Sequence, residues 1–138
     1  PDAAMPAVRR LRVLVAEDNE INQIVIGRQI EQLGHVATLV SDGHTALHEW
    51  RAGGYDIILT DCQMPEMDGF ALTREIRSLE RASPANRPIP IVAITANALS
   101  GEGERCLAQG MDGYLAKPVR LADLKALIDK LAVSPLLV

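Results

Sequence analysis

Two hydrophobic patterns alternate along the chain: short aliphatic runs, and longer segments in which apolar residues recur at helical spacing. The aliphatic runs are typical of buried strands. The alternation of strand and helix occurs five times. The predicted strands are Arg12–Ala16, Val36–Val40, Ile57–Thr60, Ile91–Thr95 and Gly113–Ala116.

Each predicted strand is followed by a predicted helix. Asn19 or Asp18 can cap the first helix and Asp68 the third, because their side chains can accept bonds from free backbone N–H groups. The predicted helices cover 19–33, 42–51, 68–79, 100–109 and 121–131. In the first of them, the apolar residues that recur at helical spacing are Ile21, Ile24, Val25 and Leu33. Residues 81–90 carry three prolines and are predicted to form a surface loop.

The order of these elements predicts an α/β fold. Strands that alternate with helices of about 10–15 residues form right-handed βαβ units and a parallel sheet. Five strands favour the flavodoxin-like, doubly wound (βα)5 arrangement with a five-stranded parallel sheet in order 2-1-3-4-5. We predict one domain at 11–133, a linker or flexible N-terminus at 1–10, and a C-terminal tail at 134–138.

Composition narrows the classes of function. The 138 residues are 48% hydrophobic but only 3% aromatic, so the core must be aliphatic, as in parallel sheets covered on both faces. A net charge of −4 without a basic run argues against nucleic-acid binding. No apolar stretch approaches the ~20 residues of a membrane span. Cys62 and Cys106 make no disulfide framework and are expected to serve packing, so we expect a cytoplasmic location without direct membrane contact.

Reactive side chains lie at the carboxyl ends of four predicted strands. Glu17 and Asp18 follow the first strand and Asp61 the third, while Thr95 ends the fourth and Lys117 follows the fifth. In a doubly wound sheet these ends share one edge, where ligands bind at the reversal of strand order. Crowded carboxylates favour a hard divalent cation such as Mg²⁺. Asp61 could then act as a nucleophile on phosphorus, with an amine and a hydroxyl to stabilise the phosphoryl oxygens.

Each of these residues taken alone has an ordinary structural explanation. An acid after a strand is more often a helix cap or a turn residue, a threonine is often an ordinary strand residue, and a lysine is usually solvated. Their joint placement at equivalent strand ends favours the phosphoryl site.

Four stretches together carry a specific resemblance. They are Val15–Asn19, Thr60–Gly69, Ala93–Ala98 and Gly113–Pro118. They resemble the receiver domains of two-component response regulators, over about residues 12–131 of the chain. The Asn19-Glu20-Ile21-Asn22 and Thr95-Ala96-Asn97-Ala98 segments are most similar to receivers attached to hybrid sensor histidine kinases.

The resemblance implies a role for each acid at the sheet edge. Asp61 is implied to be the phosphoacceptor. Glu17, Asp18, Asp61 and the backbone carbonyl of Gln63 are implied to hold Mg²⁺.

The resemblance also implies a switch. Thr95 would be the switch hydroxyl, Tyr114 the aromatic residue whose rotamer reports phosphorylation, and Lys117 the amine that pairs with the phosphoryl group. The peptide bond between Lys117 and Pro118 is implied to be cis.

Gly103 lies in the first turn of the fourth helix, which predicts either a locally soft helix or a close approach to a neighbour.

The implied partners are a sensor histidine kinase domain, which donates from a phosphohistidine, and a histidine phosphotransfer domain. The domain would catalyse its own phosphorylation and slow dephosphorylation and would change shape on the face formed by the fourth helix, fifth strand and fifth helix. The parent protein would be a hybrid sensor histidine kinase, with this domain on its cytoplasmic side. A stand-alone single-domain response regulator is the alternative.

Two other classes fit the residues less well. Haloacid-dehalogenase-like phosphatases also form an aspartyl phosphate, but they place a second Asp two residues after the first, where this chain has Gln63. A flavodoxin-type FMN module would need a neutral phosphate loop after the first strand, and Glu17 and Asp18 would repel the phosphate. Neither class is favoured.

Overall fold

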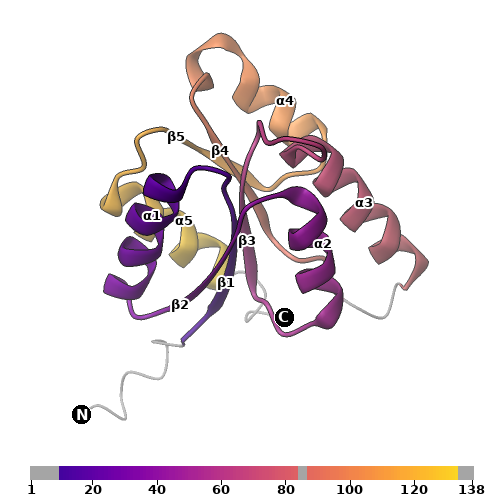
Figure 1. The fold of residues 1–138 in the computed structure, drawn as a ribbon, viewed down its shortest axis with the longest axis horizontal. Helices are drawn as coiled ribbons and strands as arrows, with labels where there is room; N and C mark the ends of the chain where they lie inside the picture. The colour runs from indigo at the N-terminus through magenta and orange to yellow at the C-terminus, as the bar shows by residue number, and fades with distance from the viewer. Residues whose placement is uncertain (1–9, 84–86, 134–138) are drawn as a thin grey trace.

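The protein folds around a single parallel sheet. The computed structural model describes residues 10–83 and 87–133, so nearly all of the predicted linker and the whole predicted tail lie outside the described residues. The strands are β1 (Arg12–Ala16), β2 (Val36–Val40), β3 (Ile57–Asp61), β4 (Ile91–Thr95) and β5 (Gly113–Ala116). They are ordered β2-β1-β3-β4-β5 and all pair in parallel, which confirms the predicted topology (Figure 1).

Helices cover both faces of this sheet. They are α1 (Glu20–Gln32), α2 (Gly43–Ala52), α3 (Gly69–Ala82), the short 3₁₀ helix η2 (Ala98–Ser100), α4 (Glu102–Ala108) and α5 (Leu121–Val133). Figure 1 shows α1 and α5 on one side of the sheet and α2, α3 and α4 on the other. Among the described residues no helix is both long and apolar enough to cross a bilayer.

Side chains that alternate along the strands divide the core between the two faces. Val13 and Val15 point to the side that carries α1 and α5, where they pack with Ile26 and Leu124. Leu14 lies in the other cluster, which α2, α3 and α4 cover. All five side chains are 3% exposed or less, so β1 is buried on both faces.

The buried face of α1 differs from the one that the apolar spacing suggested. Ile26 and Ile30 are the residues of this helix that enter the core, at 3% and 0% exposed. Ile21, Ile24 and Val25 are 71%, 52% and 48% exposed. The helix carries apolar residues around most of its circumference, and spacing alone could not decide which group faces the sheet.

Two predicted boundaries also change. Asp61 is the last residue of β3 rather than the first residue after it, because its backbone still pairs with Ile94 of β4. The fourth helix begins at Glu102 rather than near Ser100. Gly101 has a φ of +88°, a left-handed conformation that ends η2 and separates it from α4.

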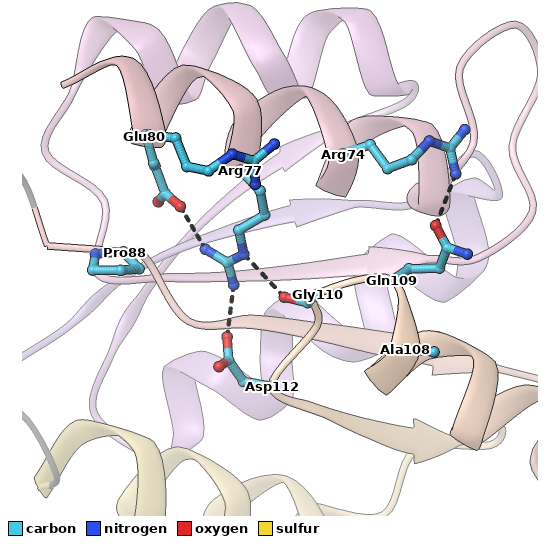
Figure 2. Close-up of a pocket in the computed structure, with 9 residues that line it drawn as sticks. Arg74, Arg77, Glu80, Pro88, Ala108, Gln109, Gly110 and Asp112 are labelled. Atoms are coloured by element: carbon cyan, nitrogen blue, oxygen red, sulfur yellow. Dashed lines mark hydrogen bonds and ion pairs between the residues drawn. The ribbon is translucent and has the colours of Figure 1, made fainter. Parts of the chain in front are cut away.

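Arg77 of α3 ties this helix to the opposite end of the sheet from the acids. Figure 2 shows its guanidinium donating to Glu80, to the backbone oxygen of Gly110 and to Asp112, at 2.8, 2.9 and 2.9 Å. It also donates to the backbone oxygen of Ile89 at 2.9 Å. One partly buried cation thus joins α3, the segment before β4 and the turn before β5.

Candidate functional site

Asp61 lies at the carboxyl end of β3, between β1 and β4, and is 6% exposed. One carboxylate oxygen, Oδ1, accepts a bond from the backbone N–H of Gln63 at 3.1 Å. The other, Oδ2, accepts a bond from the Lys117 ammonium at 2.7 Å. The Lys117–Pro118 peptide bond is cis, the isomer that the resemblance implies. The strand end therefore presents a carboxylate already paired with a cation.

Glu17 lies beside this pair and is fully buried. Its Oε2 accepts a bond from the backbone N–H of Asn19 at 3.0 Å. Its Oε1 lies 3.3 Å from the Lys117 ammonium and has no hydrogen-bond partner among the described residues. A buried carboxylate oxygen without a hydrogen bond is unfavourable, so this atom is available for a further cationic ligand.

Burial raises the pKa of the Glu17 carboxyl above its ordinary value, and repulsion from Asp61 adds to the rise. The N–H of Asn19 and the ammonium of Lys117 oppose this rise without cancelling it. Burial alone would lower the pKa of Lys117, but its bond to Asp61 and the charges of Asp61 and Glu17 outweigh burial and raise it. The ammonium thus stays protonated between two acids.

Three carboxylates can reach a common point at this edge. Glu17, Asp18 and Asp61 each offer one oxygen, and these oxygens lie within 4.8 Å of one another. The set consists of oxygen donors only, which suits a hard cation such as Mg²⁺ better than a softer metal. The orphaned oxygen of Glu17 fits the same ion.

Gly69 brings the start of α3 against the backbone of Asp61. A Cβ at this position would lie 2.5 Å from the backbone oxygen of Asp61, which is closer than real contacts allow. The N–H of Gly69 donates to the backbone oxygen of Cys62 at 3.1 Å, and Asp68 caps the helix by accepting from Ala71 at 2.8 Å. The loop after β3 therefore returns to the end of that strand and packs against the backbone of Asp61 and Cys62.

Thr95 and Tyr114 both contact the first turn of α4. The hydroxyl of Thr95 donates to the carboxylate of Glu102, and its oxygen accepts from the N–H of Asn97 at 2.9 Å. Gly103 leaves room for the ring of Tyr114, since a Cβ there would lie 2.5 Å from a ring carbon. The close approach that Gly103 suggested is confirmed, whereas nothing in the sequence pattern singled out Glu102.

The two cysteines meet in the core directly behind the acids. Cys62 follows Asp61 and Cys106 lies on α4, with their sulfur atoms 3.4 Å apart and both side chains at most 1% exposed. Burial raises the pKa of both thiols. Few thiolates form at such sites, so these residues serve packing, as the sequence suggested.

Comparison with known proteins identifies this arrangement. Residues 13–129 match the family model of the response regulator receiver domain. The chain belongs to this family. It is therefore a receiver domain of the two-component phosphorelay type, and its parallel sheet has the fold of a receiver.

Similar sequences occur in a bacterial sensor kinase and in a hybrid signalling protein of Dictyostelium discoideum. The chain is 41% identical over 115 residues to the sensor histidine kinase RcsC of Salmonella typhi, covering 83% of this chain and 12% of the kinase. It is 46% identical over 109 residues to the hybrid signal transduction protein dokA of Dictyostelium discoideum, covering 79% of this chain and 6% of that protein. The chain thus spans only a small part of these relatives.

Two solved receiver structures are similar along most of their length. The receiver domain of the Pseudomonas aeruginosa sensor histidine kinase PA1611, with a magnesium ion coordinated in its active-site cleft, is 43% identical with a TM-score of 0.77, covering 88% of this chain and 97% of that one. The Saccharomyces cerevisiae Ssk1 receiver, in complex with the histidine phosphotransfer protein Ypd1, is 31% identical with a TM-score of 0.79, covering 84% of each chain.

Proposed function

We propose that Asp61 is the phosphoacceptor of this receiver and takes its phosphoryl group from a phosphohistidine. The phosphorus–nitrogen bond of the donor breaks, a phosphorus–oxygen bond forms on the Asp61 carboxylate, and the imidazole nitrogen keeps the electron pair. The observation that carries this assignment is the position of Asp61 at the sheet edge, bonded to Lys117 at 2.7 Å and grouped with two further acids.

The neighbouring residues have complementary roles in this proposal. Glu17, Asp18, Asp61 and the backbone carbonyl of Gln63 hold Mg²⁺, which supplies positive charge against the carboxylates and the phosphoryl oxygens. The Lys117 ammonium neutralises charge on the transferring group, because it already lies within hydrogen-bond reach of the nucleophile.

Thr95 donates to a phosphoryl oxygen once the group is in place, and Tyr114 changes rotamer with it. Their contacts to α4 support the proposal, since movement of either side chain must disturb that helix.

Phosphoryl uptake tests the function directly. In the presence of Mg²⁺, we expect the protein to gain the mass of one phosphoryl group from phosphoramidate, a small donor with a phosphorus–nitrogen bond. An excess of chelator over Mg²⁺ should prevent the gain, because the three carboxylates then repel the incoming phosphoryl group. Intact-protein mass spectrometry measures both. An unchanged mass with Mg²⁺ present, or equal uptake with chelator, would contradict the assignment.

The histidine phosphotransfer partner fits an apolar patch on α1. Ile21, Ile24 and Val25 are at i, i+3 and i+4 on the helix, so their exposed side chains adjoin one another. The helix begins directly after Asp18 and its cap Asn19, which places the patch next to the acids. We propose that a histidine phosphotransfer domain docks here, consistent with the Ssk1 receiver having been crystallised with Ypd1.

Ile24→Asp tests this docking surface. A charge in a desolvated apolar contact should slow phosphoryl transfer between the receiver and a histidine phosphotransfer domain by about tenfold or more, while uptake from phosphoramidate stays unchanged. Leu107→Asp is the matched control, since Leu107 is 47% exposed on α4, across the sheet. The effect is measured as the second-order rate of phosphoryl transfer, with a histidine phosphotransfer domain that exchanges the phosphoryl group with the wild-type receiver. Equal slowing in both variants would place docking elsewhere.

A hybrid sensor histidine kinase remains the parent protein that we propose, with the receiver on its cytoplasmic side. The support is that the chain matches 12% of one sensor kinase and 6% of one hybrid protein. Stand-alone regulation is the alternative. In either setting the domain catalyses its own phosphorylation and dephosphorylation.

A further inference from the structure

Glu102 is a buried acid that the proposed chemistry does not use. It is the first residue of α4, and it is 8% exposed. Its carboxylate accepts the hydroxyl proton of Thr95, which is itself 1% exposed. A hydrogen bond from a hydroxyl to a carboxylate, shielded from water, is stronger than one between neutral groups. The bond holds the Thr95 side chain on α4.

A threonine hydroxyl has a single proton to donate. While Thr95 donates to Glu102, that proton is not available to a phosphoryl oxygen on Asp61. The oxygen of Thr95 also accepts from the N–H of Asn97, so the side chain is fixed from both sides. Phosphorylation must therefore break the bond to Glu102 before Thr95 can bond to the phosphoryl group.

The residue after Glu102 contacts the second switch side chain. Gly103 lies against the ring of Tyr114, and Glu102 and Gly103 both belong to the first turn of α4. Release of Thr95 from Glu102 removes one contact between this turn and the sheet. Loss of the Thr95 bond is thus transmitted to the place where Tyr114 packs.

We propose that Glu102 is a positioning residue that competes with the phosphoryl group for the hydroxyl of Thr95, and so sets how strongly the resting state of the receiver is favoured. The proposal rests on the assignment of Asp61 as phosphoacceptor. Without the Glu102 carboxylate, the Thr95 hydroxyl has no acceptor on α4. The bond from Thr95 to the phosphoryl group then forms without the loss of another hydrogen bond.

Beryllofluoride binding tests this competition, because this anion mimics a phosphoryl group on a carboxylate. With Mg²⁺ present, we expect Glu102→Ala to bind beryllofluoride about tenfold more tightly than the wild type, since one charge-assisted bond no longer has to break. Glu102→Gln keeps a neutral acceptor of the same shape and should give a smaller gain. Fluorine NMR titration of the protein with beryllofluoride measures the affinity.

Two controls separate competition from a general effect on the helix. Glu104→Ala removes an exposed acid from the same turn and should leave the affinity unchanged. In a Thr95→Val background, which has no hydroxyl, Glu102→Ala should have no effect, because Glu102 acts only through that hydroxyl.

The outcomes distinguish the two proposals. Absence of beryllofluoride binding by the wild type would overturn the phosphoacceptor assignment. Binding by the wild type with no gain in Glu102→Ala would overturn the role of Glu102 alone. An equal gain in Glu104→Ala, or a gain that persists in the Thr95→Val background, would also overturn it, because the effect would then not pass through Thr95.

Discussion

Asp61→Asn is expected to gain no phosphoryl mass from phosphoramidate under conditions in which the wild type is converted. An amide oxygen is a poor nucleophile and carries no negative charge, so it neither attacks phosphorus nor contributes a charged oxygen to the cluster with Glu17 and Asp18. The change also removes the ion pair with Lys117. Intact-protein mass spectrometry over the time course of wild-type uptake measures the loss.

Asp68→Asn is the matched control for this experiment. Asp68 lies seven residues further along the chain, after the loop that follows β3, and caps α3 by accepting the N–H of Ala71. Asparagine is an equally good cap, so this variant should fold and accept the phosphoryl group as the wild type does. Phosphoryl mass that persists in Asp61→Asn, or is lost equally in Asp68→Asn, would show that Asp61 is not the acceptor.

Arg77→Met is expected to lower the free energy of unfolding by about 3 kcal/mol, close to the cost of leaving one member of a buried ion pair without its partner. Methionine keeps the aliphatic stem but has no donors, so the carboxylate of Glu80 and the backbone oxygens of Ile89 and Gly110 each lose a bond. Glu80 is 8% exposed and cannot turn to water without opening the core. Urea unfolding followed by circular dichroism measures the change.

Arg74→Met controls for the loss of an arginine from the same helix. Arg74 is exposed, and Figure 2 shows it bonded to Gln109, at 3.0 Å. Its replacement should cost about 0.5 kcal/mol or less. Adding Glu80→Gln to Arg77→Met should recover part of the loss, because the orphaned charge is removed. Similar costs for Arg74→Met and Arg77→Met would mean that the buried network contributes little.

The sequence predicted the architecture because its signals are local. Aliphatic runs, capping residues such as Asp68 and glycine stops lie next to the elements that they define. The βαβ connections imply a parallel sheet, and the strand order is that of the flavodoxin-like class that five such units favour. The grouping of Glu17, Asp61 and Lys117 could be predicted for the same reason, since parallel strands bring their carboxyl ends to one edge. The position of each of these residues at the end of a predicted strand was enough to place all three at the same edge of the sheet.

Other features depend on packing between elements and left no local signal. Glu102 follows Thr95 by seven residues, and the path of the chain through η2 and Gly101 and the packing of α4 on the sheet bring the two together. The exposed face of α1 could not be chosen because Ile24 and Ile26 are equally apolar, and the surface of the sheet decides which is buried. The close approach of Cys62 and Cys106 arises in the same way.

The division of the core into two layers has a consequence for how the domain can be used in a signalling complex. The exposed patch of α1 belongs to the layer that α1 and α5 form, whereas α4 covers the opposite layer with α2 and α3. A protein that binds α1 and a protein that binds α4 without α5 therefore contact opposite faces of the sheet, whereas a partner that also binds α5 reaches the layer of α1. A partner on α1 and an output partner on α4 can therefore be bound to the domain at the same time.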